Sequence, residues 1–250
     1  MVYLIFIILM KKYAFTCILI CWLITAYTQP TSFKLDENSI VKDSAGYSYP
    51  YAIWRTLLSK GYSIKPIDPK NKNSQFLLIK LTDKQFAERL EKMPKPMESK
   101  YFTTGEKIKL FKTRDINNDK INLKEFEGKV IVLNFWFINC PPCRREIPDL
   151  NELVEKYKNN DSVKFVAVAL DQRSELKDFL KTMPFDYAIV DNGKYLADSY
   201  GIKSYPTHVI VDAGGKVYFH SSGVATNTVY WLKKTIDELL SSQLTVQNKL

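Results

Sequence analysis

Two cysteines separated by two residues are the part of this sequence best suited to chemistry. Cys140 and Cys143 bracket two prolines, and the other two cysteines, Cys17 and Cys21, lie in the apolar N-terminal stretch. A Cys-x-x-Cys pair can form half of a zinc site or cycle between dithiol and disulfide. If the chain beyond the N-terminal stretch enters an oxidising compartment, it has no further cysteine for a structural disulfide, and this pair is then used for redox chemistry.

The segments around the pair predict a strand followed by a helix. The nearly continuous apolar run from Lys129 to Phe137 is typical of a central strand covered on both faces. Apolar residues then recur on one helical stripe, at Ile147, Leu150, Leu153, Val154 and Tyr157. Cys140 would begin this helix, where free backbone N–H groups and the helix dipole stabilise a thiolate. We therefore expect Cys140 to be the more exposed and more acidic thiol, with Cys143 one turn inside.

The rest of the C-terminal part alternates between strand and helix patterns. This order predicts an α/β fold with a central, mostly parallel sheet flanked by helices, over residues 105–243. Strands are expected at 163–170 and 187–190, a hairpin at 207–212 and 216–221, and helices at 174–181 and 226–240. His208 and His220 fall on the hairpin strands, and we predict no metal site.

Residues 31–99 predict a small α+β module that precedes this domain. Apolar residues around Trp54 recur at helical spacing, residues 76–79 are strand-like, and Thr82 to Gln85 form a capping box that begins another helix. Prolines at 94 and 96 then break the chain. The module contains no cluster of titratable residues, so packing or partner docking is its expected role.

Residues 1–28 are nearly all apolar and predict a signal peptide or an N-terminal anchor. If translation starts at Met10, Lys11 and Lys12 form the positive n-region and cleavage before Gln29 is expected. If it starts at Met1, the lysines interrupt the apolar stretch and favour an uncleaved anchor in contact with the membrane. Both readings export the remaining chain to the periplasm or cell envelope, as a soluble or tethered protein.

The composition is that of a globular protein without a nucleic-acid partner. Apolar residues make up 46% of the chain, and the net charge is +9. Lysines and arginines are scattered among acidic residues rather than gathered in a basic block, which is typical of a solvated surface.

Two landmarks together resemble a known family. The segment from Asn134 to Leu150, with Cys140-Pro-Pro-Cys143 at its centre, is similar to the TlpA/ResA branch of the thioredoxin superfamily. The segment from Gly201 to Gly215 is similar to the cis-proline loop and following hairpin of that family. The resemblance covers about residues 105–243 and implies a thioredoxin-like fold.

The resemblance also implies catalytic roles. Cys140 would be the thiolate that attacks and forms a mixed disulfide, and Cys143 the thiol that resolves it. Glu146 matches an acidic residue that this branch places beneath the active site, where it would exchange protons with the thiols. Thioredoxin has a buried aspartate where this chain has Asn134. An asparagine is no base, so the proton-transfer role shifts to Glu146 or water.

Three further residues are implied to bind the substrate. Pro206 would follow a cis peptide bond and face the cysteine pair, which would expose the backbone of Tyr205 for pairing with a client. Trp136 is similar to a tryptophan that stacks beside the active site in the family.

The sequence thus predicts an exported thiol-disulfide oxidoreductase that reduces protein disulfides. The resemblance implies protein clients and a membrane electron donor, and we expect neither cofactor nor metal. Two alternatives remain: a thiol peroxidase of the same fold, whose Pro-x-x-x-Thr-x-x-Cys setting is absent here, and a redox-inert binding or chaperone module.

Overall fold

The structure is a computed structural model that describes residues 35–71 and 73–247. These residues divide into two compact units, with the boundary between Asp83 and Lys84. The helix at 83–92 and the proline-containing segment after it therefore group with the C-terminal unit, whereas the sequence placed them in the N-terminal module. The predicted signal peptide or anchor at 1–28 lies outside the described residues. Within the described part of the chain, no helix is long and apolar enough to cross a membrane.

The N-terminal unit is a four-stranded sheet with one helix. The sheet has the order β2-β1-β4-β3, in which only the β1–β4 pairing is parallel. Its elements are β1 (Val41–Lys42), β2 (Ser48–Tyr49), α2 (Tyr51–Ser59), β3 (Tyr62–Pro66) and β4 (Phe76–Lys80). Trp54 of α2 is buried in a core cluster with Val41, Phe76 and Leu78. The predicted helix and the strand at 76–79 are confirmed; the short strands β1 and β2 and strand β3 were not predicted.

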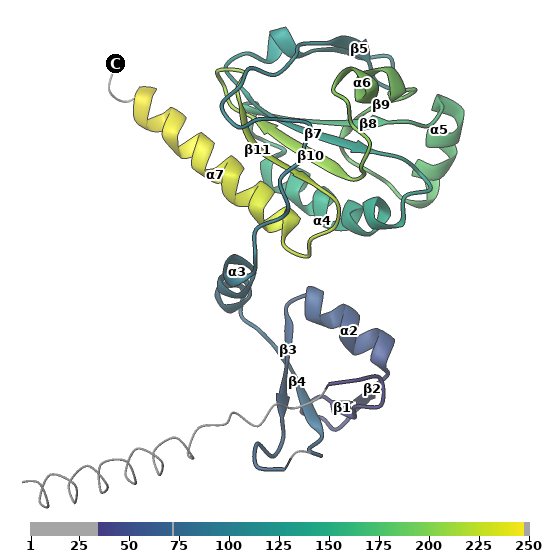
Figure 1. Ribbon diagram of the computed structural model, residues 1–250, viewed down its shortest axis with the longest axis vertical. Coiled ribbons are helices and arrows are strands. Elements are labelled where there is room, and N and C mark those ends of the chain that lie inside the picture. The colour runs from purple at the N-terminus through teal and green to yellow at the C-terminus, as the bar shows by residue number, and fades with distance from the viewer. Residues whose placement is uncertain (1–34, 72, 248–250) are drawn as a thin grey trace, which may run out of the picture. The chain divides into compact units, whose positions relative to one another are not determined.

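The C-terminal unit is built on a five-stranded sheet with the order β11-β10-β7-β8-β9 (Figure 1). Its strands are β7 (Val130–Trp136), β8 (Val163–Ala169), β9 (Ala188–Val190), β10 (Thr207–Val211) and β11 (Val217–Ser222). β10 pairs antiparallel with both of its neighbours, whereas β7, β8 and β9 pair in parallel. Four strands therefore run in one direction, which confirms the predicted mostly parallel sheet and the thioredoxin-like fold.

Helices and a small hairpin cover this sheet. The remaining elements of the unit are α3 (Asp83–Lys92), β5 (Lys112–Arg114), β6 (Lys120–Asn122), the 3-10 helix η1 (Leu123–Phe126), α4 (Pro141–Tyr157), α5 (Arg173–Thr182), α6 (Lys194–Ser199) and α7 (Thr228–Gln247). Apolar side chains of α4, α5 and α7 pack in one core, and those of β6, η1 and α6 in a second. The six-residue helix α6 was not predicted.

The two cores lie on opposite faces of the sheet because side chains alternate along a strand. In β7 and β10, the face that we call the α4 face carries Val132, Asn134, His208 and Ile210. The opposite face, which we call the α6 face, carries Leu133, Phe135, Val209 and Val211. Asn134 and His208 are directly paired in the antiparallel register. The covering helix α4 thus meets two polar side chains within an otherwise apolar surface.

Candidate active site

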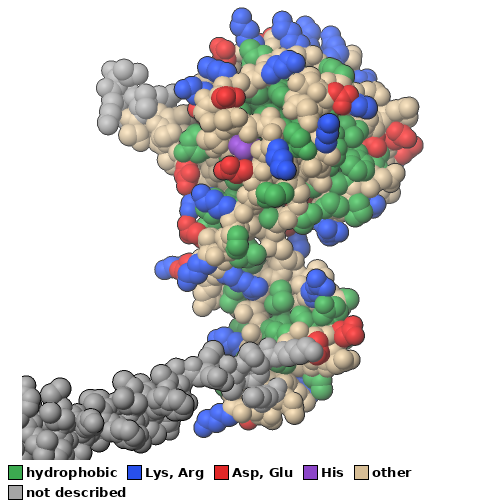
Figure 2. Space-filling model, in the orientation of Figure 1, with side chains coloured by type: hydrophobic (Ala, Val, Ile, Leu, Met, Phe, Trp, Pro, Cys, Tyr) green, Lys and Arg blue, Asp and Glu red, His purple; other side chains and the backbone are tan. Residues whose placement is uncertain are grey.

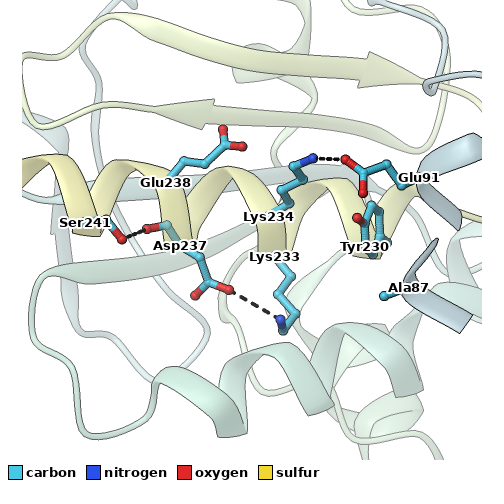
Figure 3. A pocket seen from close by; sticks show the side chains of 8 residues that line it. All are labelled: Ala87, Glu91, Tyr230, Lys233, Lys234, Asp237, Glu238 and Ser241. Carbon is cyan, nitrogen blue, oxygen red and sulfur yellow. Dashed lines mark hydrogen bonds and ion pairs between the residues drawn. The ribbon is translucent and has the colours of Figure 1, made fainter. Parts of the chain in front are cut away.

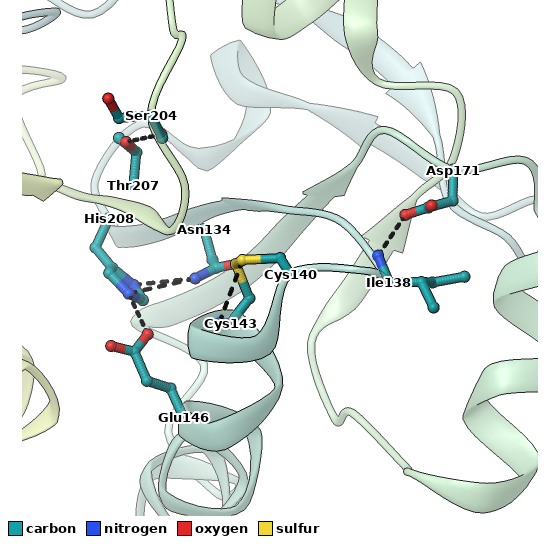
Figure 4. Close-up of a disulfide and its surroundings, with 9 residues drawn as sticks. All are labelled: Asn134, Ile138, Cys140, Cys143, Glu146, Asp171, Ser204, Thr207 and His208. Atoms are coloured by element: carbon teal, nitrogen blue, oxygen red, sulfur yellow. Dashed lines mark hydrogen bonds and ion pairs between the residues drawn. A yellow bond between two sulfur atoms is a disulfide. The ribbon is translucent and has the colours of Figure 1, made fainter. Parts of the chain in front are cut away.

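The cysteine pair lies at the connection between strand β7 and helix α4, as predicted. Cys140 is the N-cap residue of α4, and prolines occupy the first two helical positions, where a backbone N–H has no intrahelical acceptor. The two cysteines form a disulfide with their Cα atoms 5.3 Å apart (Figure 4). The Cys143 N–H donates to the Cys140 Sγ at 3.3 Å. A free N–H of the first helical turn is therefore aimed at the sulfur that the sequence assigns as the attacking atom.

The expected difference in exposure between the two cysteines is not seen in this disulfide form. Both residues are 3% exposed. The sulfurs are bonded to each other, and the half-buried side chains of Phe137 and Tyr205 pack against the same core cluster. Exposure therefore does not separate the attacking from the resolving cysteine here, and the assignment rests on their positions at the helix N-terminus.

The loop before Cys140 is tied to the end of β8. The backbone N–H of Ile138 donates to the Asp171 Oδ2 at 2.8 Å. Burial raises the pKa of the Asp171 carboxyl, and this hydrogen bond opposes the rise. The contact fixes the chain between β7 and α4, so it holds the loop that leads into the disulfide.

A buried polar chain of three side chains lies one helical turn from Cys143. Glu146 follows Cys143 on the buried stripe of α4, and its Oε2 lies 2.9 Å from the His208 Nε2. The His208 Nδ1 lies 3.1 Å from the Asn134 Nδ2. Figure 4 shows Glu146 and Asn134 pointing at His208 from α4 and β7. His208 is fully buried, and Asn134 and Glu146 are 2% and 9% exposed.

Several buried polar atoms of Asn134, Glu146 and neighbouring core residues have no hydrogen-bond partner among the described residues. They are Glu146 Oε1, Asn134 Oδ1, Tyr187 OH and Trp136 Nε1. Burial raises the pKa of the Tyr187 hydroxyl, and the charge of Glu146 raises it further, so this hydroxyl keeps its proton. Buried polar atoms are normally paired, so each unpaired one in a native fold calls for an explanation.

The cis-proline loop lies next to the cysteine pair in the core packing. The Tyr205–Pro206 peptide bond is cis, as the family resemblance implied. The ring of Tyr205 meets the ring of Phe137 edge-on, with centroids 5.4 Å apart. Both side chains are half-buried and pack against the cluster that contains Cys140 and Cys143. These two rings, which we call the aromatic rim, thus pack on each other and on the core cluster that includes the disulfide.

Trp136 requires a correction. We expected it among the substrate-binding residues, but it is 1% exposed. Its ring packs edge-on against Phe185 and at a tilt against Phe179, both of which belong to segments that follow β8. These rings cover the end of β7, so Trp136 has no surface to offer a client and supports the site from within the core.

His208 is the site residue that sequence reasoning missed. It was placed on a hairpin strand without a role, because its partners lie 62 and 74 residues away in the sequence. A signal did exist: His208 is the second residue of a strand that begins at Thr207, and the alternation along that strand places it on the same face as Asn134. The partner strand and the register were needed to recognise the contact.

A separate hollow of about 650 Å³ lies along α7 and α3, away from the disulfide (Figure 3). Four of its charged side chains form two ion pairs, Lys234 with Glu91 and Lys233 with Asp237, and Glu238 also lines it. Figure 2 shows lysine and arginine side chains interspersed with acidic ones over the visible face of the C-terminal unit. Among the described residues, no group of three or more His, Cys, Asp or Glu side chains is placed to hold a metal ion.

The chain is similar in sequence to known proteins. The sequence model of the AhpC/TSA family matches residues 104–220. The thiol-disulfide oxidoreductase ResA of Bacillus thuringiensis subsp. konkukian is 35% identical over 134 residues, which are 50% of this chain and 77% of that protein. The thioredoxin-like protein YneN of Bacillus subtilis is 28% identical over 135 residues, 53% of this chain and 79% of that protein.

Solved structures show the same likeness. A protein of Chlorobium tepidum assigned as the thiol:disulfide interchange protein DsbE superposes with a TM-score of 0.51 at 28% identity, covering 56% of this chain and 99% of that one. The residues matched by the family model, 104–220, lie in the C-terminal unit and include the cysteine pair.

Proposed function

Because the chain belongs to the ResA family of thiol-disulfide oxidoreductases, in the thioredoxin superfamily, we propose that it reduces disulfide bonds of other proteins through Cys140 and Cys143. One observation carries this proposal: the two cysteines form a disulfide at the N-terminus of α4, and the buried carboxylate of Glu146 lies one turn further along the same helix face.

The proposed reaction has two thiol–disulfide exchange steps. In the reduced form, the Cys140 thiolate attacks a client disulfide, an S–S bond forms between Cys140 and the client, and one client sulfur leaves as a thiolate that takes a proton from solvent. The Cys143 thiol then loses its proton to Glu146 and attacks Cys140. The Cys140–Cys143 disulfide forms and the second client thiolate departs. The client gains two electrons, and the cysteine pair loses them.

We place the client at the rim formed by Phe137, Tyr205 and the cis-proline loop. The half-buried rings supply an apolar contact beside the disulfide. The backbone of Tyr205 precedes strand β10, so it is suited to pair with an extended client segment.

The location is part of the proposal. Residues 1–28 would export the protein to the periplasm or cell envelope as a signal peptide or as an anchor, and an electron donor in the membrane would return the pair to the dithiol state. N-terminal sequencing of the protein purified from its membrane and soluble fractions tests this. A mature start at Gln29 supports a cleaved signal peptide, and an intact N-terminus in the membrane fraction supports an anchor. Recovery only in the cytoplasm contradicts export.

The decisive experiment is trapping with Cys143→Ser in the full chain. Without the resolving thiol, the Cys140 mixed disulfide should persist and co-purify with client proteins that reductant releases. The matched variant Cys140→Ser should capture none of these clients. Failure of Cys143→Ser to accumulate any mixed disulfide, or equal capture by Cys140→Ser, contradicts the proposal.

The match to the AhpC/TSA family supports one competing function, a thiol peroxidase. A peroxidase of that type attacks peroxide with a cysteine in a Pro-x-x-x-Thr-x-x-Cys setting, and neither Cys140 nor Cys143 has it. Peroxide consumption by the purified protein separates the two functions. We expect the wild type to turn over disulfide substrates and to consume peroxide no faster than a simple dithiol does.

A further inference from the structure

The buried imidazole of His208 has two side-chain partners, and the proposed cycle as written makes no use of it. It is the second residue of strand β10, its side chain lies on the α4 face, and none of its surface is exposed. A buried neutral histidine is common in protein cores. A buried histidine whose ring nitrogens both meet polar side chains, one of them a carboxylate next to a redox pair, has a more specific arrangement.

The hydrogen-bond partners fix which nitrogen of His208 carries the proton. An amide nitrogen only donates, and the Asn134 Nδ2 lies 3.1 Å from the His208 Nδ1 and 3.5 Å from its Nε2, so the shorter contact makes Nδ1 the acceptor. The proton of a neutral ring must then reside on Nε2, where it is donated to the Glu146 Oε2 at 2.9 Å. The three side chains therefore form a directed chain of donors, from Asn134 through His208 to the carboxylate of Glu146.

This arrangement makes the two oxygens of Glu146 unequal. Oε2 accepts from His208, whereas Oε1 is buried and has no hydrogen-bond partner among the described residues. A carboxylate oxygen in this situation is desolvated without compensation, which makes it the better place for a proton. The oxygen free to exchange a proton is therefore Oε1.

We propose that His208, oriented by Asn134, is a positioning residue that holds the carboxylate of Glu146 through Oε2, one helical turn from Cys143, as the acceptor for the proton of the Cys143 thiol. The inference rests on the proposed function, because the proton it concerns is the one released when Cys143 resolves the mixed disulfide. In that step the S–H bond of Cys143 breaks and its proton passes to the carboxylate of Glu146. The Cys143 sulfur bonds to Cys140, and the bond between Cys140 and the client breaks to release the client thiolate. The proton on Nε2 of His208 stays in place throughout.

The groups that face Glu146 are few, so its response to pH can be read from them. His208 faces it from β10, Tyr187 acts on it electrostatically from the segment before β9, and Cys143 shares its helix face. Asn134 of β7 carries no charge. The residues of α5 and α7 in this core, Leu176, Leu232, Ile236 and Leu239, carry none either. Among these groups, the His208 N–H is the one that donates a hydrogen bond to the carboxylate, so the pH dependence of the resolution rate should differ in a variant that lacks it.

The first test is nitrogen-15 NMR of the side chains in the oxidised wild type. The chain has two histidines, so the spectrum holds two imidazoles, which His220→Leu assigns. We expect His208 at pH 7 as a neutral ring protonated on Nε2. A ring protonated on Nδ1, or an imidazolium, would overturn the inference. This measurement needs no change at His208 itself.

The second test compares His208→Leu with His208→Gln. Leucine removes the donor, and the mixed-disulfide resolution rate at pH 7 should fall about ten-fold, within the range of a lost hydrogen bond to a charged group. Glutamine keeps an N–H near the position of Nε2 and should restore most of the rate. His220→Leu, the matched change on the α6 face, should resolve at the wild-type rate.

The third test shows whether His208 acts through Glu146. In a Glu146→Gln background, His208→Leu should slow resolution no further. A further ten-fold loss in that background, or a wild-type rate for His208→Leu at every pH from 5 to 9, would overturn the inference. If the wild type itself forms no mixed disulfide, the proposed function fails instead, and the NMR result still decides whether the donor chain exists. If His208→Leu does not fold, the glutamine variant and the NMR result decide.

Discussion

The C-terminal unit buries two histidines on opposite faces of one hairpin, and they differ in their partners. His208 of β10 lies on the α4 face between Asn134 and Glu146. His220 of β11 pairs in register with Val209, so it lies on the α6 face, where its Nδ1 accepts from the backbone N–H of Ser99 at 3.0 Å. The exposed fractions are 0% for His208 and 5% for His220, so burial does not distinguish them.

The difference lies in what each partner can do. The backbone N–H of Ser99 donates a hydrogen bond but neither takes up nor releases a proton. His220 therefore only ties a distant part of the chain to the hairpin. Burial lowers the pKa of His220 and keeps it neutral. A carboxylate can take and release a proton, so His208 is linked to a group whose charge changes during the reaction. For a buried titratable side chain, the chemistry of the partner is thus more informative than the burial itself.

The largest effect should come from the carboxylate on the α4 face. Glu146→Gln should slow mixed-disulfide resolution about 100-fold at pH 7, which is the lower end of what general acid–base catalysis contributes. The fold should remain intact because glutamine has nearly the same volume. Stopped-flow exchange kinetics measure this, with Glu152→Gln on the exposed face of α4 as the control. Wild-type kinetics for Glu146→Gln across pH 5 to 9 would remove this residue from the mechanism.

On the α6 face we expect a loss of stability without a loss of rate. His220→Leu leaves the buried N–H of Ser99 without its acceptor, which should cost about 1–3 kcal/mol in the free energy of unfolding. Denaturant unfolding measures that cost, and the exchange rate of the folded variant should equal that of the wild type. A ten-fold slower exchange would mean that the two faces are not separate in function.

How far the sequence predicts this molecule depends on the separation of the contacting residues. The strand before the disulfide, the helix after it and the position of Glu146 all follow from spacings within 30 residues. The Asn134–His208 contact follows from a register between strands that are 74 residues apart, so pattern alone could not place it. The expectation for Trp136 was wrong because its cover comes from Phe179 and Phe185, which no local period connects to it.

A smaller effect is expected from Asn134→Asp, which restores the residue type that thioredoxin has at this point. A carboxylate beside the His208 Nδ1 would favour a proton there, and the ring would become an imidazolium that still donates to Glu146. We therefore expect only a few-fold change in the resolution rate, together with an imidazolium signal for His208 in nitrogen-15 NMR. A loss as large as that of Glu146→Gln would show that the charge of the ring matters more than its position.

The smallest effect belongs to the far end of the same helix. Asp237 of α7 accepts from Lys156 and Tyr157 of α4 at 2.7 and 2.6 Å. Burial raises the pKa of Asp237, but these donors outweigh it and leave the pKa lowered. A lowered carboxyl pKa stabilises the fold above the unfolded value of about 3.9, and this contribution is lost as pH falls through the folded value.

Asp237→Asn should therefore cost at most about 1 kcal/mol at pH 7, since both charged partners are more than a third exposed. The difference from the wild type should shrink as the pH falls through the lowered pKa of Asp237 in the folded state, because the wild-type carboxyl then loses its charge too. Thermal unfolding at pH 7 and at low pH checks this. Any change in exchange rate at pH 7 would contradict the view that this end of α4 is only structural.

The pairing of His208 with Asn134 has an evolutionary consequence. Side chains on a strand alternate between faces, so one residue inserted between Pro206 and Thr207 would send the imidazole to the α6 face and bring Thr207 under α4. Both strands would stay apolar enough to fold, and the cysteines would remain in place. A single added codon would thus remove the donor chain from Asn134 through His208 to Glu146 while leaving both cysteines in the sequence.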